Sequence, residues 1–165
     1  MSRPPLENLR LVGFENLSAS VLRTRLLAAR HEFWSGNGAT DEDVRALHDP
    51  LFFHQLGGFG AVALTPEETD AGYLLGVVSA DRLAVVHALA VRPGHRRQGV
   101  ATALVERFAR LAATAGARAL QAVVAPDDEP AQALGARLGA TAAPSPDHAG
   151  PGVDRLVLTR SLPLS

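Results

Sequence analysis

The segment Val91–Leu104, VRPGHRRQGVATAL, combines residue types that could hold an anion. An apolar run ends at Val91, Arg96 and Arg97 follow, and Gly99 precedes a stretch with the apolar spacing of a helix. The first N–H groups of a helix lack backbone acceptors and together carry about half a positive charge. Arginine offers a planar fork of donors to phosphate, and glycine lets a ligand approach the backbone. The segment therefore predicts an anion cradle, most naturally for a pyrophosphate.

The composition excludes several other kinds of chemistry. The chain carries 16 basic and 17 acidic side chains, a net charge of -1, and every basic residue is arginine. Because lysine and cysteine are absent, the chain has no Walker lysine, Schiff base, thiolate nucleophile, cysteine zinc site or disulfide. The balanced charge argues against a nucleic acid or a membrane surface as partner.

Length and hydropathy predict one soluble domain. A chain of 165 residues with 47% hydrophobic content can bury a core of its own, so we expect a single domain over residues 1–165. The start, MSRPPLENLRLVGF, lacks the apolar stretch of a signal peptide, and no run approaches the roughly 20 residues of a membrane span. We expect a cytoplasmic protein.

The elements that must position the cradle follow from periodicity. The pattern predicts the order βααβββαβαββ, an α/β (α+β) fold with a mixed, mostly antiparallel central sheet flanked by helices. A strand–helix–strand crossover from Leu83 to Ala125 implies one parallel strand pair. Strands are predicted over 9–14, 59–64, 71–79, 82–91, 117–125 and 153–162, and helices over 18–33, from 40, from 99 to 116 and over 127–139.

Smaller signals fix the ends of the last two helices. The first of these two helices carries Leu104, Phe108, Leu111 and Ala115 on one face and is predicted to end at Gly116. The second starts from Asp127 or Asp128 as its cap and ends before Gly139, and the segment 144–152, PSPDHAGPG, is predicted as a loop.

The opening segment resembles the acetyl-CoA-binding motif of the GNAT acetyltransferase superfamily. The motif reads Arg/Gln-x-x-Gly-x-Gly/Ala, here Arg96-x-x-Gly99-x-Ala101, after a strand that ends in Val-x-Pro. The order of elements is similar to the GNAT fold along about the whole chain, whereas the G-x-G-x-x-G of a Rossmann fold is absent. The resemblance implies direct transfer of an acetyl group from acetyl-CoA to a small-molecule amine or a protein amino group.

The resemblance also implies which residues hold the co-substrate. The backbone of Leu89, Ala90 and Val91 would bind the pantetheine arm, and Arg96 or Arg97 would lie beside the phosphates. The amides of Gln98, Gly99, Val100, Ala101 and Thr102 would hold the pyrophosphate.

A second motif of the family, Asn-x-x-Ala followed by Tyr-x-x-x-Gly-Phe, is only partly present. Aligned on Ala131 and Gly139, it puts Asp128 at the asparagine and Gly135 at the tyrosine that often protonates the departing thiolate. Tyr73, the one tyrosine of the chain, is expected in the core. A larger residue at Gly135 requires open space, and we expect Gly135→Tyr to fold and still bind acetyl-CoA.

The catalytic base is less well marked. His87 shares a strand face with Val85, Leu89 and Val91, so a buried imidazole there could act near neutral pH, or it could be a hydrogen-bonded core histidine. No metal site is predicted, because HEFWS at 31–35 lacks the second histidine of a zinc-protease helix and His48 and His54 have no matching carboxylates.

Three functions remain open from the sequence. The chain is either an N-acetyltransferase, a catalytically weak acyl-CoA-binding or sensor module that has lost its acid, or a nucleotide-binding domain without CoA. Trp34, Phe52 and Phe53 either shape the acceptor site or pack in the core. A homodimer is left open.

Overall fold

The computed structural model describes residues 6–13 and 58–165, together with the single positions 16, 18, 24, 33, 40 and 42. The two helices predicted before residue 58 lie outside the described ranges. So do the side chains of His31, Trp34, His48, Phe52, Phe53 and His54.

The described strands form one seven-stranded sheet in the order β1-β2-β3-β4-β5-β7-β6. In chain order, they are β1 (Arg10–Gly13), β2 (Phe59–Leu64), β3 (Asp70–Val78), β4 (Leu83–Val91), β5 (Ala119–Val124), β6 (Thr141–Ser145) and β7 (Arg155–Ser161). The pairs β1–β2, β2–β3, β5–β7 and β6–β7 are antiparallel, and β4–β5 is parallel. The mixed, mostly antiparallel sheet and its parallel pair confirm the predicted fold class.

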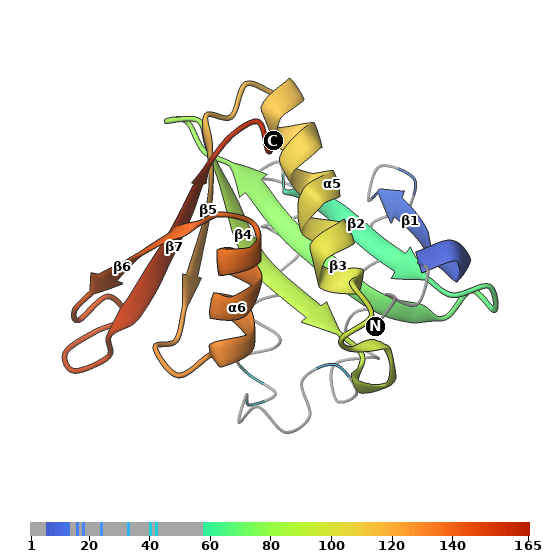
Figure 1. The fold of residues 1–165 in the computed structure, drawn as a ribbon, viewed down its shortest axis with the longest axis horizontal. Coiled ribbons are helices and arrows are strands. Elements are labelled where there is room, and N and C mark those ends of the chain that lie inside the picture. Colours follow the sequence, from blue (N-terminus) through green and yellow to red (C-terminus); the bar gives the residue numbers. More distant parts are fainter. Residues whose placement is uncertain are drawn as a thin grey trace. The chain divides into compact units, whose positions relative to one another are not determined.

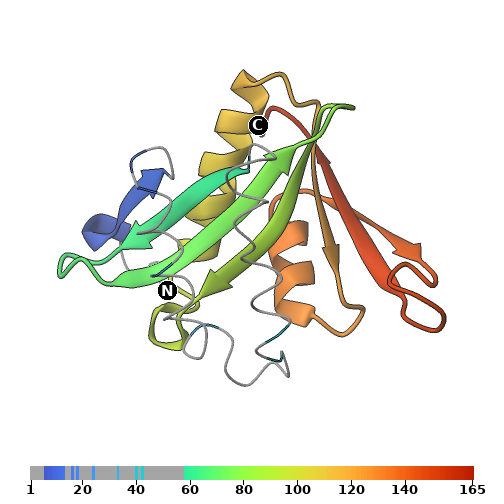
Figure 2. The same ribbon diagram turned by 180° about the vertical axis from the view of Figure 1, so that it is seen from behind.

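The helical elements of the described part are η1 (Leu6–Asn8), η3 (Pro93–His95), α5 (Val100–Thr114) and α6 (Glu129–Arg137). From β2 onward, the predicted order is confirmed, and the predicted bounds of β2 match those observed. The predicted order ends in two strands, of which only the last has predicted bounds; β6 is the other one, and it includes Pro144 and Ser145 of the predicted loop. It is the outer strand beside β7 (Figure 2), where the missing N–H of a proline can face solvent at no cost to the ladder.

The chain divides into two compact units. The first holds the described residues up to Val77 with His87–Phe108, and the second holds Val78–Val86 with Ala109–Ser165. Among the described residues, the largest fully buried side chains all belong to the first unit: Phe33, Val62, Tyr73, Leu74, Leu75, Leu104 and Phe108. Buried side chains of the second unit include Ala84, Ala112, Ala119, Leu120 and Leu158.

Gly72 lets β3, β4 and the first turn of α5 pack closely in the first unit. A Cβ at this position would lie 2.9 Å from the Ala90 carbonyl oxygen and 3.1 Å from Val100 Cγ1. Any larger residue would push β4 or the helix start away, so this glycine sets the position of the predicted cradle.

The buried face of α5 differs in part from the predicted one. Val100, Leu104, Phe108 and Ala112 are buried as expected for a helix over a sheet, but Leu111 is 39% exposed and Ala115 lies beyond the helix end. Val105 and Ala109, which the prediction did not include, are buried as well, so the buried face is turned toward them and Leu111 lies at its margin.

Both α5 and α6 end just before the glycines predicted to terminate them. Gly116 (φ 89°) and Gly139 (φ 74°) adopt left-handed backbone conformations. After α5, the Gly116 and Ala117 N–H groups donate to the Ala113 and Ala112 carbonyls. After α6, Gly139 and Ala140 donate to Ala136 and Gly135 in the same way. Both ends are therefore Schellman motifs.

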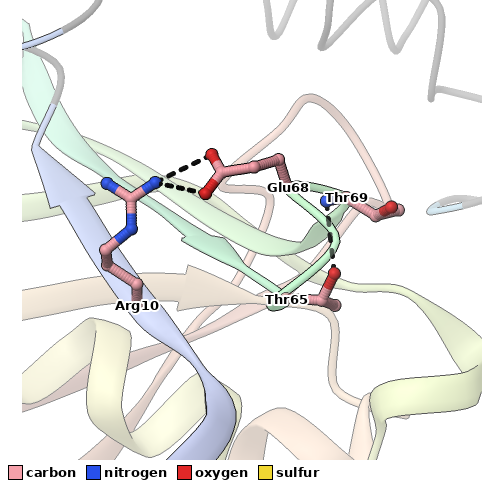
Figure 3. A network of polar contacts seen from close by, with 4 residues as sticks. All are labelled: Arg10, Thr65, Glu68 and Thr69. Carbon is pink, nitrogen blue, oxygen red and sulfur yellow. Dashed lines mark hydrogen bonds and ion pairs between the residues drawn. The ribbon is translucent and has the colours of Figure 1, made fainter.

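A surface ion pair joins β1 to the turn between β2 and β3 (Figure 3). One guanidinium nitrogen of Arg10 donates to both carboxylate oxygens of Glu68 at 2.7 Å, and the two side chains are 61% and 64% exposed. The Thr69 N–H donates to Thr65 Oγ1 within the same turn. Exposed pairs contribute about 0–1 kcal/mol, so this contact orients the turn more than it stabilises the fold.

Candidate anion-binding site

The loop between β4 and α5, visible in Figure 1 as the short turn before the yellow helix, begins with η3 and contains two left-handed residues. Arg97 has φ 62° and Gly99 has φ 87°. The Gly99 carbonyl accepts from Ala103 N–H at 3.0 Å, so Gly99 is the N-cap of α5. Helix geometry leaves the next three amides, those of Val100, Ala101 and Thr102, without intrahelical acceptors.

The backbone of this loop is open to a ligand. Among the atoms of the described residues, a Cβ at Gly99 would meet only Leu6 Cδ1, at 4.0 Å, and a Cβ at Gly94 would meet none within 4 Å. The first turn of α5 contains no acidic residue. Positive backbone charge, a glycine cap and a first turn without an acid would suit a pyrophosphate, and its binding at this loop stays a prediction.

The two arginines of the motif differ in what they contact. Arg97 is exposed, and no described residue forms a hydrogen bond or ion pair with its guanidinium. Arg96 Nε donates to the Val91 carbonyl at 3.0 Å, and its Nη2 donates to the Phe33 carbonyl at 3.3 Å. Only Arg97 therefore presents an uncommitted fork of donors beside the cradle.

A cluster around Phe33 adjoins this loop, and the sequence analysis did not predict it. Phe33 is 2% exposed, its ring meets that of Tyr73 edge-on at 5.1 Å, and the Arg92 guanidinium lies 5.1 Å from its centroid. Arg92 Nε also donates to the Asp70 carbonyl at 2.8 Å. Tyr73 is in the core as expected. No local pattern could reveal the cluster, since Phe33 and Arg96 are 63 residues apart in the chain.

Strand β4 carries the remaining predicted residues of the first unit. Its pairing with β5 covers Leu83–Val86, and the strand continues to Val91. Ala88 and Ala90 are buried, whereas His87 is exposed and Leu89 is half-buried. The expectation of a buried His87 is therefore wrong, because the core face of β4 is the alanine face. Its exposed imidazole stays a candidate base.

The second unit holds Asp128 and Gly135. Asp128 Oδ1 accepts from the Ala131 N–H at 3.1 Å and is the N-cap of α6, as the cap pattern predicts. Its role toward the co-substrate stays a prediction. Gly135 is buried, and a Cβ there would lie 3.0 Å from Leu158 Cδ1. The expectation that tyrosine fits at this position is wrong, because α6 packs against β7 there.

Two searches of the described residues give negative results. No group of three or more His, Cys, Asp or Glu side chains in this part of the chain could hold a metal ion. Among the helices described, none is long and apolar enough to cross a membrane.

Comparisons with known proteins show which family and which solved structures this chain resembles. The model of the acetyltransferase (GNAT) family matches residues 25–140. A Staphylococcus aureus acetyltransferase of that family has a similar structure, with 12% identity and a TM-score of 0.72 over 94% of this chain and 99% of the other. An aminoglycoside 6'-acetyltransferase type Ii matches at 16% identity and a TM-score of 0.69 over 93% and 98%. A variant of the Vibrio cholerae spermidine N-acetyltransferase matches at 15% and 0.66, covering 94% of each chain. The curated proteins searched give no match.

Proposed function

Since the chain belongs to the acetyltransferase (GNAT) family and is an N-acetyltransferase, we propose that its loop between β4 and α5 binds acetyl-CoA through the pyrophosphate. The observation that carries this proposal is the open, left-handed Gly99 at the start of a helix with no acid in its first turn. A pyrophosphate is the part of acetyl-CoA that such a helix start recognises best.

Each part of the loop has a role in this proposal. The amides of Gln98 to Thr102 donate to the phosphates, and Arg97 adds a charge-assisted contact from its exposed guanidinium. The side chain of Arg96 is proposed to position the loop and not to bind phosphate, because it already donates to two carbonyls. The backbone of Leu89, Ala90 and Val91, where β4 continues past its pairing with β5, is proposed to hold the pantetheine arm.

The chemistry requires a proton acceptor and a proton donor. When bound, acetyl-CoA supplies a thioester whose carbonyl an amine can attack directly, and no cysteine exists to form an acyl-enzyme. His87 is proposed to accept the proton that the amine nitrogen loses. Because Gly135 stands where the family has tyrosine, we propose that water protonates the thiolate of the leaving CoA.

The acceptor is proposed to be an amine, either a small molecule or an amino group of a protein. Two structural neighbours carry names that include an aminoglycoside and spermidine, an amino sugar and a linear polyamine. At 16% and 15% identity these names choose the probes for an experiment and do not identify the substrate.

The test compares two glycines that share a backbone conformation. Gly99 and Gly116 have φ values of 87° and 89°, and no atom of a described residue would lie closer than 4.0 Å to a Cβ at either, so alanine strains the backbone equally at each. Calorimetric titration with acetyl-CoA should show affinity weakened about tenfold or more by Gly99→Ala, through lost close approach, and unchanged by Gly116→Ala. Equal affinities in the two variants would overturn the site.

Activity is measured separately as CoA release with spermidine, an aminoglycoside and a peptide with a free N-terminus. Turnover with one of these amines supports the transferase assignment and names the acceptor class. Binding of acetyl-CoA without release by any amine would favour the weak acyl-CoA-binding module instead. Stabilisation by ATP in preference to CoA would favour the nucleotide-binding alternative.

A further inference from the structure

Arg96 connects two segments that are far apart in the sequence. Its Nε contacts the carbonyl of Val91, the last residue of β4, and its Nη2 contacts the carbonyl of Phe33. Both acceptors are main-chain oxygens, so the geometry depends on the fork of the guanidinium and not on the identity of the two residues. The side chain thus joins residue 33 to the strand that leads into the cradle.

Phe33 is held from two further directions by the first unit. Its ring lies edge-on to Tyr73, and the Arg92 guanidinium lies over its face. Arg92 is itself fixed by donating its Nε to Asp70 and its backbone N–H to Ala71, both at 2.8 Å. With an exposure of 2%, Phe33 cannot shift without disturbing the strand end and the loop that follows it.

We propose that Arg96 is a positioning residue that couples occupation of the cradle to the segment at Phe33. Arg96 and Arg97 are consecutive, and Arg97 is in a left-handed conformation with its guanidinium exposed. A contact between Arg97 and a phosphate constrains the backbone of both residues. Arg96 transmits that constraint to the Phe33 carbonyl. This inference rests on the proposed binding of acetyl-CoA at the loop.

A phosphate-binding role for Arg96 is the competing explanation. It requires the side chain to give up its bonds to Val91 and Phe33 or to share its remaining donors. Leaving the two carbonyls without this donor has a cost that Arg97 does not incur. The observed contacts therefore favour a division of labour in which Arg97 holds the anion and Arg96 holds the protein.

The chain supplies a reporter beside Phe33. Trp34 is the one tryptophan of the sequence, so its emission monitors this segment alone. The experiment compares wild type, Arg96→Gln and the matched variant Arg97→Gln by calorimetry with acetyl-CoA, by Trp34 emission, and by hydrogen exchange of the peptide that contains Phe33. Arg96→Lys is the conservative variant, because an ammonium keeps the charge but loses the fork.

In wild type, acetyl-CoA should change Trp34 emission and slow exchange at Phe33. Arg96→Gln should abolish both responses while the affinity for acetyl-CoA stays within about threefold, and Arg96→Lys should restore them in part. Arg97→Gln should weaken acetyl-CoA about tenfold and retain both responses at saturation.

Kinetics with the best amine of the panel give a second, independent readout. Trp34, which follows Phe33, is one of the residues expected to shape the acceptor site. Arg96→Gln should therefore raise the KM of the amine about fivefold or more and leave that of acetyl-CoA near wild type, whereas Arg97→Gln should do the reverse. A loss of acetyl-CoA affinity in Arg96→Gln equal to that in Arg97→Gln, with normal responses at saturation, would overturn the proposal. So would wild type that binds acetyl-CoA without either response. Wild type that does not bind acetyl-CoA contradicts the proposed function itself.

Discussion

The two described helices that are longer than one turn begin in opposite ways. At α6, Asp128 places a carboxylate oxygen 3.1 Å from the Ala131 amide, and Glu129 adds a second acid to the first turn. At α5, the cap is Gly99, which has no side chain, and the first turn contains no acid. The C-termini of the two helices, by contrast, end in the same Schellman motif.

The difference shows how a helix start becomes available to a ligand. The N-terminal charge of α6 is neutralised by the helix's own residues, which stabilises the fold and leaves little for an external anion. With glycine at its cap, α5 gives up only a few tenths of a kcal/mol relative to a capping side chain and keeps its amides open beside two arginines. An uncapped helix start with adjacent cations is thus the feature that distinguishes the site.

The largest effect is expected when α5 is given the kind of cap that α6 has. Gly99→Asp places a carboxylate at the cradle, and Gly99→Asn places an uncharged group of the same shape there. Asp and Asn both adopt the left-handed backbone conformation of Gly99 more readily than most residues do. We expect Gly99→Asp to weaken acetyl-CoA about 100-fold, because it repels the phosphates and competes for the amides.

Gly99→Asn serves as the control for that experiment. It should lose clearly less affinity than the aspartate, and rising salt should narrow the gap between the two variants as charges are screened. Titration calorimetry at two ionic strengths measures both effects. Equal losses in the two variants would mean that shape, not charge, determines binding at Gly99.

A second comparison concerns one glycine at the packing surface of each helix, Gly72 in β3 against α5 and Gly135 within α6 itself. At Gly72 a new Cβ would lie 2.9 Å from a backbone oxygen of β4, whereas at Gly135 it would lie 3.0 Å from the end of the Leu158 side chain. A backbone atom cannot move aside cheaply, so Gly72→Ala should destabilise the fold by about 1–3 kcal/mol. Gly135→Ala should stay within about 1 kcal/mol of wild type, because Leu158 can rotate and alanine favours a helix. Chemical denaturation of both variants provides the measurement, and equal losses would contradict the reasoning.

The sequence predicted the backbone framework well because the framework depends on local signals. The bounds of β2, the glycine ends at Gly116 and Gly139 and the Asp128 cap all rest on residues within a few positions of each other. The openness of Gly99 is equally local, since a cap without a side chain can be read directly from the residue type.

Side-chain roles were harder to predict because they depend on distant partners. Nothing near Arg96 in the sequence indicates that its guanidinium reaches the carbonyl of Phe33. The burial of His87 was predicted wrongly because alternation along β4 defines two faces without saying which meets the core. The space at Gly135 depends on Leu158, which lies on another element.

Removing the α6 cap should have a moderate effect on stability. Asp128→Ala leaves the Ala131 amide without its acceptor and should lower the free energy of unfolding by about 0.5–2 kcal/mol, whereas Asp128→Asn should retain most of it. Thermal unfolding of the three proteins checks this order. Calorimetry with acetyl-CoA on the same samples tests the co-substrate contact that the family resemblance implies for Asp128. An asparagine variant as unstable as the alanine variant would contradict capping as the main role.

The smallest expected effect concerns Asp81. Like Asp128, its carboxylate accepts a hydrogen bond from a residue nearby in the chain. The Ser79 hydroxyl donates to Asp81 in the turn between β3 and β4, and this bond holds the pKa of the carboxyl below its ordinary value, with a smaller contribution from Arg118. Because the pKa is lower in the folded state, the stabilisation is complete above the ordinary value of about 3.9 and is lost as the pH falls through the folded pKa. We expect Ser79→Ala to raise the pKa of Asp81 toward that ordinary value in an NMR titration. We also expect the variant to differ from wild type less in stability at low pH than at neutral pH. An Asp81 pKa that is unchanged in Ser79→Ala would show that Arg118 and the turn backbone, rather than the hydroxyl, stabilise the charge.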